Sequence, residues 1–484
     1  MDQPVKPSVA TLDALPEGVE KPDYDPATLS PGIVHIGIGN FHRAHMGVYL
    51  DRLFGQGGPT DWAIVGAGVR PPGDVEMRDR LAAQDWLTTV VELDPAGLSA
   101  RVTAPMTGFA EITPEATIAA MADPRIRIVS LTVTEGGYYT RADGSFDAEH
   151  PDIQADATGD TPRTAFGMIL AALRRRREAG TEPFTIMSCD NLPGNGHAAH
   201  AACGGLAEMR GETDLLDGVA FPNGMVDCIT PATTDKVRDM VRTRFGLDDA
   251  APVICEPFRQ WVLEDNFPTG RPPLEEVGVE FVADVVPYEL MKLRVLNAAH
   301  AAIAYPSALL GHVTVHEAVA DPDVANWVRA VIAHEAIPTL APIEGVDFHA
   351  YLDTCMERFA NAEVGDTVAR LCLDGSNRQP KFVLPTLRDR LKDGKTIEGL
   401  ALEVALWRAY AATGGTEAAP VIEDERADRL HAAAQEAPSA FLALEDVFGD
   451  LRQDARFAEA FEAACSTIEA NGPRGAIRDY VAAA

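Results

Sequence analysis

The chain has 484 residues, more than one ordinary hydrophobic core would hold, and its 46% hydrophobic and 24% charged residues are typical of a globular protein of two domains. Its formal net charge of −32 argues against nucleic acid and anionic membranes as partners, because both carry negative charge. The seven cysteines form no C-x-x-C pair and neither a signal peptide nor a membrane-length apolar stretch is apparent, which predicts a cytoplasmic protein with reduced thiols.

Strands and helices alternate in the first half of the sequence. Residues 32–37 form an apolar run that ends in glycine, residues 44–54 a helical segment and residues 62–66 a second apolar run. Together they predict a β-α-β unit and therefore a parallel sheet. Further extended segments are predicted at residues 127–133, 184–189, 222–227, 253–256 and 281–286, with a helix at residues 164–179.

The pattern changes at Pro287, a residue type that favours the first turn of a helix. From there the sequence is mostly helical, with helices predicted at residues 287–304, 324–336, 349–359, 396–412, 426–436 and 455–471. We therefore expect an α/β protein with a mostly parallel sheet in a domain over residues 1–286 and a mainly α-helical domain over residues 287–484. A ligand site is expected where the two domains meet.

A glycine-rich turn follows the first strand. Gly37 and Gly39 match two of the three glycines of a dinucleotide fingerprint, one for the tight turn and one for the approach of a pyrophosphate, while His42 replaces the third. The acid expected to bind a ribose hydroxyl is Asp74, for which a solvated loop charge is an equal alternative. Arg70 nearby would accept the additional phosphate of NADP, so the choice between NAD and NADP stays open.

The start of the helical half carries polar groups suited to hydride transfer from an alcohol. That reaction needs a base for the hydroxyl proton and donors that stabilise charge on the oxygen. On a helix of about 100° per residue, four polar side chains fall within an arc of roughly 140°. They are Glu289, Lys292, Asn297 and His300. A lysine among apolar neighbours loses basicity and can act as the base near neutral pH.

The regular helix raises a difficulty, because Lys292 and His300 would be about 12 Å apart along its axis. We therefore expect His300 to bind a neighbouring hydroxyl, or the helix to be distorted. Asn191 follows a predicted strand, at the edge that faces the ligand crevice in open parallel sheets, and its amide is a candidate donor to the reacting oxygen. A turn-forming asparagine is the equal alternative, because Asn, Pro and Gly cluster there.

Seven motifs along the chain carry a resemblance to a known family. They are GIGNFHRAH at residues 37–45, SLTVTEGGY at 130–138, MSCDN at 187–191, FPNGMVDCIT at 221–230, CEPFRQWVLEDNF at 255–267, the segment 285–300 and DGSNRQPKF at 374–382. In this order they resemble the polyol-specific long-chain dehydrogenases, the mannitol dehydrogenase family. The resemblance implies a zinc-independent enzyme with an N-terminal Rossmann domain, a sugar-like small-molecule substrate, NAD as cofactor with NADP as the alternative, and no metal.

The resemblance also implies roles for individual residues. Lys292 would be the general acid/base, and Asn191 and Asn297 would polarise the reacting oxygen. The other residues are His300 for substrate binding, Glu289 and Glu135 for proton relay, Gly37, Gly39, Asn40, Phe41 and Asp74 for cofactor binding, and Asp227, Arg370 and Arg378 for substrate contacts. The chain departs from the family in two places, since many members carry Lys where Arg378 stands and Gly-Ser where this chain has Ala298-Ala299.

Two reactions within the family fit these motifs: oxidation of a hexitol such as mannitol to a ketose, and reduction of fructuronate. Arg259 and Arg294 favour the reductase, whereas residues 84–89 and 380–382 favour the hexitol reaction, which we prefer. A uronate carboxylate would need an additional cation, ideally a bidentate arginine. Outside the family, the alternatives are a non-catalytic dinucleotide-binding regulator and a zinc hydrolase that uses His42, His45 and Glu135.

Overall fold

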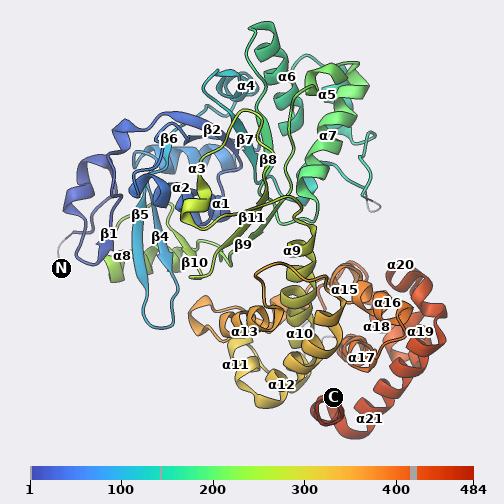
Figure 1. The fold of residues 1–484 in the computed structure, drawn as a ribbon. Helices are drawn as coiled ribbons and strands as arrows, with labels where there is room; N and C mark the ends of the chain where they lie inside the picture. The colour runs from blue at the N-terminus through green and yellow to red at the C-terminus, as the bar shows by residue number, and fades with distance from the viewer. Residues whose placement is uncertain (1–2, 142–143, 415–421) are drawn as a thin grey trace. The chain divides into compact units, whose positions relative to one another are not determined.

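A five-stranded sheet lies at the centre of the first of two units. The computed structural model describes residues 3–141, 144–414 and 422–484, and the chain divides into Met1–Val286 and Pro287–Ala484. The strand order of the central sheet is β6-β3-β2-β7-β8, and every pairing in it is parallel (Figure 1). The strands are β2 (Pro31–Ile36), β3 (Ala63–Ala67), β6 (Met106–Phe109), β7 (Ile128–Leu131) and β8 (Thr185–Ser188). This architecture confirms the predicted α/β class with a Rossmann-like sheet.

Alternate side chains of β2 enter two different cores, as expected for a strand with both faces covered. Val34 and Ile36 belong to a core that includes residues of α4 (Pro114–Ala122), α5 (Pro151–Thr158), α6 (Ala165–Glu178) and α7 (Asn195–Arg210). Ile33 belongs to the core on the other face, which includes residues of α2 (Met46–Gly55) and α3 (Gly73–Ala82). The near-continuous apolar sequence of β2 follows from this burial on both sides.

The strand order changes direction at β2, because the chain extends to β3 and β6 on one side and to β7 and β8 on the other. In open parallel sheets such a switch point marks the place where a dinucleotide binds, at the carboxyl ends of the strands. The register aligns Ile36 with Leu131 and Leu131 with Ser188. The segments that follow β2, β7 and β8 therefore emerge side by side at one edge of the sheet.

Two smaller sheets complete the first unit. One has the order β1-β5-β4-β10 and contains an antiparallel β4–β5 pair, and the other has the order β12-β11-β9. Their strands are β1 (Val19–Glu20), β4 (Thr88–Glu92), β5 (Ser99–Thr103), β9 (Gly224–Asp227), β10 (Val253–Cys255), β11 (Gln260–Glu264) and β12 (Glu280–Val282). The strand predicted at residues 281–286 was wrong in extent, because β12 ends at Val282 and the helix α9 begins at Val286.

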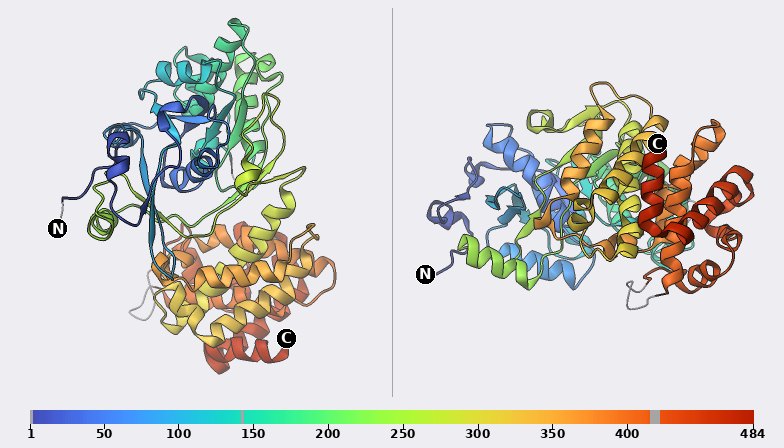
Figure 2. Two further views of the ribbon diagram at one scale, coloured as in Figure 1. Left: turned by 60° about the vertical axis from the view of Figure 1, so that its left-hand side comes forward. Right: turned by 90° about the horizontal axis from the view of Figure 1, so that it is seen from below.

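Helices build the second unit (Figure 2, yellow to red). They are α9 (Val286–Met291), α10 (Ala298–Leu310), α11 (Val315–Ala320), α12 (Pro322–Val331), α13 (Phe348–Phe359), α14 (Val368–Cys372), α15 (Gly375–Phe382), α16 (Leu384–Lys392), α17 (Glu398–Thr413), α18 (Ala427–Gln435), α19 (Pro438–Leu442), α20 (Glu445–Phe448) and α21 (Ala455–Ala483). α10 contacts α14 and α17, and α21 contacts α12 and α17. Among the described residues, no helix is both long and apolar enough to cross a bilayer.

Candidate active site

The glycine turn after β2 has the geometry that its sequence predicts. Gly37 has a φ of +99°, and a Cβ there would lie 2.2 Å from the Thr132 carbonyl oxygen, so both backbone conformation and space require glycine. Thr132 Oγ1 donates to the Gly37 carbonyl over 2.6 Å. A Cβ on Gly39 would meet only the Gly37 carbonyl oxygen within 4 Å, at 3.9 Å, so the backbone at Gly39 is open to a ligand.

The third fingerprint glycine is replaced by a histidine that packs inside the unit. The His42 ring is 1% exposed and stacks on His35, with ring centroids 3.6 Å apart. His35 in turn hydrogen-bonds Ser130 Oγ over 2.7 Å and Thr132 Oγ1 over 2.8 Å. Burial lowers the pKa of His35 to about 3, so this ring is neutral at neutral pH. The stacked pair supports the turn in place of the close helix–strand contact that a third glycine would allow.

Asn40 and Phe41, the other predicted cofactor residues, start the short helix α1 (Asn40–Ala44). The Asn40 side chain is used within the unit, because its Nδ2 donates to Thr233 Oγ1 over 3.0 Å and its Oδ1 accepts from Arg43 over 2.8 Å. The Phe41 ring stacks on His45, with centroids 4.8 Å apart. A cofactor contact at these two positions would therefore come from the backbone amides.

Asp74 lies beyond the end of β3, in the first turn of α3. Its Oδ2 accepts the backbone N–H groups of Val69 and Arg70, each over 2.7 Å, and a Cβ on Gly68 would lie 2.6 Å from the Asp74 side chain. The carboxylate therefore closes the turn after β3, a structural task that the sequence did not reveal. Binding of a ribose hydroxyl by Asp74 stays a prediction.

Glu135 and Asn191 are brought to the same sheet edge, although they are far apart in sequence. Glu135 begins a short 3₁₀ helix after β7, and Asn191 follows β8, the neighbouring strand. Both are exposed.

Asp227 is buried at the end of β9. Asn195 links that strand to the turn after β8, since its Nδ2 donates to the carbonyl oxygens of Asp190 and Gly224 over 3.0 and 2.7 Å.

In the second unit, the segment with the predicted base is not a regular α-helix. Lys292–Asn297 is a π-helix between α9 and α10, so the regular α-helical geometry was wrong here and the distorted helix that the sequence analysis left open is present. Because π-helical hydrogen bonds join residues i and i+5, Lys292 and Asn297 lie about one turn apart, whereas in an α-helix they would be roughly 140° apart around the axis. The distorted winding therefore brings the two side chains towards one face. Lys292 is 7% exposed, and Glu289 is also buried.

His300 lies three residues after Asn297, in α10, where it is 9% exposed. Its ring is 4.5 Å from that of Phe359, and its buried Nε2 has no hydrogen-bond partner within the described chain. Burial lowers the pKa of His300 to about 3, with a smaller contribution from Arg370. A neutral imidazole with an unsatisfied nitrogen is suited to hydrogen-bond a hydroxyl.

The two predicted substrate arginines lie in the elements that pack on α10. Arg370 in α14 forms a bidentate pair with Asp366, with both N–O distances 2.5 Å, and this pairing raises the pKa of the guanidinium. Arg378 in α15 donates to the Leu371 carbonyl over 2.9 Å, and burial lowers its pKa. Asp366 was not identified from the sequence, although its spacing of four residues from Arg370 is a signal for such a pair.

The zinc-hydrolase residues do not form a metal site. His45 hydrogen-bonds the Gln260 carbonyl over 3.0 Å, while His42 faces His35. Within residues 3–141, 144–414 and 422–484, no group of three or more His, Cys, Asp or Glu side chains is arranged to hold a metal ion.

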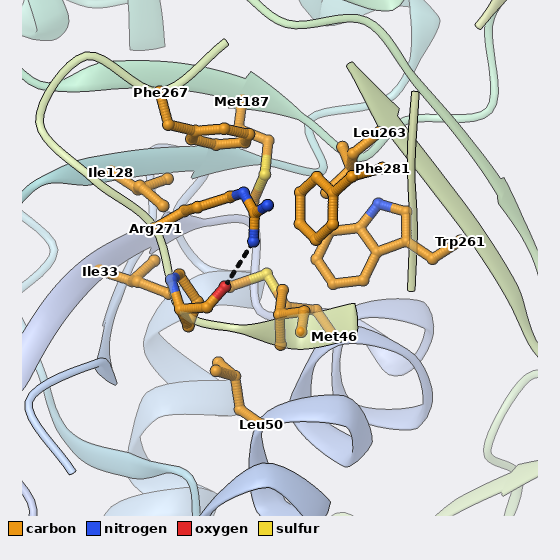
Figure 3. Close-up of a pocket in the computed structure, with 12 residues that line it drawn as sticks. Ile33, Met46, Leu50, Ile128, Met187, Trp261, Leu263, Phe267, Arg271 and Phe281 are labelled. Carbon is orange, nitrogen blue, oxygen red and sulfur yellow. Dashed lines mark hydrogen bonds between the residues drawn. The ribbon is translucent and has the colours of Figure 1, made fainter. Parts of the chain in front are cut away.

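One apolar pocket lies in the first unit, between the sheet and the β11–β12 region (Figure 3). Sheet residues Ile33, Ile128 and Met187 line it together with Trp261 and Phe281, and the Arg271 guanidinium stacks on Phe281 at 3.3 Å. Its free space of about 10 Å³ is at the lower limit for a single water molecule. It is a packing gap in the core and too small for a sugar or a nucleotide.

Comparison with known proteins covers almost the whole chain. Residues 31–276 match the model of the mannitol dehydrogenase Rossmann domain, and residues 284–469 match that of the mannitol dehydrogenase C-terminal domain. The chain is 52% identical to a mannitol 2-dehydrogenase of Cereibacter sphaeroides, over 97% of this chain and 100% of the relative.

Two solved structures are similar over their full length. One is the ternary complex of Pseudomonas fluorescens mannitol 2-dehydrogenase with NAD and D-mannitol, with a TM-score of 0.85, 40% identity and coverage of 99% of this chain and 100% of that chain. The other is D-sorbitol dehydrogenase in substrate-free form, with a TM-score of 0.91, 34% identity and coverage of 98% and 100%.

Proposed function

Because the chain belongs to the mannitol dehydrogenase family, we propose that it is an NAD-dependent dehydrogenase that oxidises a polyol to a ketose, of the mannitol-to-fructose type, and catalyses the reverse reduction. Its relative, a mannitol 2-dehydrogenase, and the NAD and D-mannitol bound to the Pseudomonas enzyme support this reaction. In this chain, the observation that carries the proposal is a buried lysine, Lys292, in a π-helix that ends at Asn297 and continues into the helix with the buried His300.

The glycine turn after β2 fits the pyrophosphate of NAD. Gly37 brings the backbone close to Thr132, and Gly39 leaves its surroundings open. The backbone amides at the start of α1 would face the phosphates, because the Asn40 side chain is already engaged. When bound, NAD supplies the acceptor for the hydride that leaves the substrate carbon.

Lys292 accepts the hydroxyl proton of the substrate in the proposed oxidation and returns it in the reduction. Asn297 and Asn191 donate amide hydrogens to the reacting oxygen as negative charge develops on it. His300, whose Nε2 is buried and unsatisfied, binds a neighbouring hydroxyl. Glu289 and Glu135 relay the proton, and Asp227, Arg370 and Arg378 bind the remaining hydroxyls. These roles are proposals that follow the family motifs.

The reductase alternative receives no support from the two arginines that suggested it. Arg294 in the π-helix donates to Asp389 over 2.5 Å and to Thr339 Oγ1 over 2.6 Å, and Arg259 is 3% exposed at its side chain beside Glu92. Both guanidinium groups are committed within their own units. A uronate carboxylate would need a bidentate arginine with free donors.

A substrate screen tests the proposal. The purified protein is assayed with NAD and with NADP against mannitol, arabinitol, sorbitol and mannonate, and formation of the reduced cofactor is followed. We expect mannitol with NAD to give the highest kcat/KM. Preference for mannonate would favour the reductase, and binding of NADH without turnover of any substrate would favour a regulator.

The cytoplasmic location expected from the sequence stays a prediction.

A further inference from the structure

Asp190, directly before Asn191, carries the strongest further inference. The residue is 8% exposed, and its carboxylate accepts three hydrogen bonds. Oδ2 accepts from the Val133 backbone N–H over 2.9 Å and from the Tyr138 hydroxyl over 2.7 Å, and Oδ1 accepts from the Thr134 backbone N–H over 2.9 Å. A side chain from the turn after β8 therefore holds the loop that follows β7, the loop with Glu135.

The loop needs to be held, because its backbone conformation is unfavourable. Thr134 has φ +67° and ψ 162°, a region that is almost restricted to glycine, and Tyr139 at the other end is left-handed with φ +54°. The two glycines of the loop, Gly136 and Gly137, are not among the residues with positive φ. The strained position is therefore occupied by Thr134, immediately before Glu135. The backbone N–H of this threonine donates to Asp190 Oδ1.

The hydrogen bonds from Val133, Thr134 and Tyr138 to Asp190 form a clamp between the two loops, and other contacts hold Tyr138 and Asp190 in place. The Tyr138 hydroxyl also contacts Ser188 Oγ over 2.5 Å, and its ring is buried 5.7 Å from that of Phe166 in the sheet core. The Asp190 carbonyl accepts from Asn195 Nδ2, which links it to β9. Both carboxylate oxygens accept hydrogen bonds inside the protein, which gives Asp190 a structural task in this unit.

We infer that Asp190 is a positioning residue: it fixes the distance between Asn191, on its own turn, and Glu135, on the neighbouring loop, by compensating for the strained backbone of Thr134. The inference rests on the proposed function, in which Asn191 and Glu135 take part in catalysis. Its physical basis is that misplacement of catalytic groups by about 1 Å can lower the rate by about 100-fold.

The chain offers a matched control, because Asp156 is a second buried carboxylate with the same kind of bonds. It is 2% exposed and accepts from the backbone N–H groups of Arg163 and Thr164 and from the Thr164 hydroxyl. It clamps the start of α6 and lies outside the predicted site residues. Loss of its charge should disturb the fold to a comparable degree without moving Asn191 or Glu135.

The experiment compares Asp190→Asn, Asp190→Ala, Asp156→Asn, Tyr138→Phe and the double variant Asp190→Ala/Thr134→Gly with the wild-type enzyme. The measurements are kcat with mannitol, the dissociation constant of NADH, the thermal midpoint and hydrogen exchange of the Val133 and Thr134 amides. We expect Asp190→Asn to lower kcat by about 100-fold, with NADH binding changed less than about twofold and faster exchange at both amides. Asp156→Asn should lower the thermal midpoint and keep kcat.

The double variant tests the cause. Glycine adopts the backbone of residue 134 without strain, so Thr134→Gly should restore much of the kcat that Asp190→Ala loses. Should Asp190→Asn not fold, Tyr138→Phe, which removes one of the three bonds, should still lower kcat and speed exchange. Wild-type kcat in a folded Asp190→Asn or Tyr138→Phe variant, or a double variant as slow as Asp190→Ala, would overturn the inference. A wild-type protein without polyol turnover would refute the proposed function instead, while the exchange measurement would still test the clamp.

Discussion

Arg259 Nη1 lies 2.6 Å from Glu92 Oε1, and the Arg259 side chain is only 3% exposed. Its Nε donates to the Ala44 carbonyl over 2.7 Å, and its Nη2 lies 3.0 Å from Cys255 Sγ. All three nitrogens of the Arg259 guanidinium therefore have a partner inside the first unit. An arginine that the sequence associated with a sugar acid is instead part of the framework between α1, β4 and β10.

Replacement of Arg259 by Met should therefore affect stability more than substrate choice. Breaking a buried ion pair costs about 3 kcal/mol or more, and the partial exposure of Glu92 reduces this figure. We expect a lower midpoint of urea unfolding and an unchanged ratio of kcat/KM for mannitol and mannonate. Arg52→Met is the control, because Arg52 contacts the same Glu92 at 3.4 Å but is 42% exposed. A selective loss of mannonate turnover would contradict the structural role of Arg259.

Lys292→Ala should abolish most oxidation and leave cofactor binding nearly intact. General acid–base catalysis contributes about 10²–10⁴-fold, so kcat should fall by this amount. The measurements are steady-state kcat with mannitol and the NADH dissociation constant. Lys392→Ala, on an exposed lysine of the same unit, should behave like the wild type. Unchanged turnover in Lys292→Ala would refute the assignment of the base.

The buried His300 should make the second unit less stable in acid. Burial lowers its pKa to about 3, whereas the unfolded side chain titrates near 6.5. Between these values the unfolded state binds an additional proton, so the free energy of unfolding should fall as the pH falls, by up to about 1.4 kcal/mol per pH unit from this group. His300→Gln should show a smaller slope in urea unfolding between pH 7 and 5. An equal slope in this variant and in His349→Gln, on an exposed histidine, would contradict the prediction.

Glu403 should have the opposite pH dependence. Burial raises its pKa to about 8, and Gln379 Nε2 donates to its Oε1 over 2.6 Å. Between pH 4.5 and 8 the folded state keeps a proton that the unfolded state has lost, so this group should reduce stability as the pH rises through that range. Glu403→Gln should be more stable than the wild type at pH 9, measured by the thermal midpoint.

The contrasting case is Glu335, a buried carboxylate that accepts two backbone amides and the Tyr480 hydroxyl. Because Glu335→Gln would place donors against donors, it should destabilise the protein at the same pH. Stabilisation of both variants would mean that burial alone, and not hydrogen bonding, decides the effect.

Chelation should not affect the reaction, because the proposed acid/base is a lysine. The enzyme is dialysed against EDTA, assayed with mannitol and NAD, and assayed again after addition of zinc. We expect the same kcat throughout. Activity lost on dialysis and restored by zinc would overturn the metal-free mechanism.

Much of the fold could be predicted from the sequence, because apolar runs and helical periodicity are properties of short segments. The apolar runs at residues 62–66 and 184–189 correspond to β3 and β8, and the helix expected at residues 164–179 corresponds to α6. The β4–β5 pair was not anticipated, because an antiparallel pairing depends on a partner strand and not on the pattern of either segment alone. A distortion near Lys292 was among the expectations, but its π-helical form was not, because residue spacing does not record which carbonyl each amide selects.

The sequence by itself predicted a glycine turn at Gly37 after the first strand, and its motifs identified the family. The structure supplied the reason for the glycine, a φ of +99° and a close approach to Thr132. Only the tertiary structure decided which charged side chains already have an ion-pair partner within the protein. Arg259 and Arg294 look like ligand-binding cations in the sequence, yet each is committed to a carboxylate that lies more than ninety residues away. The hydrogen-bond partners of a buried charge are set by long-range packing, and no local pattern of residues records them.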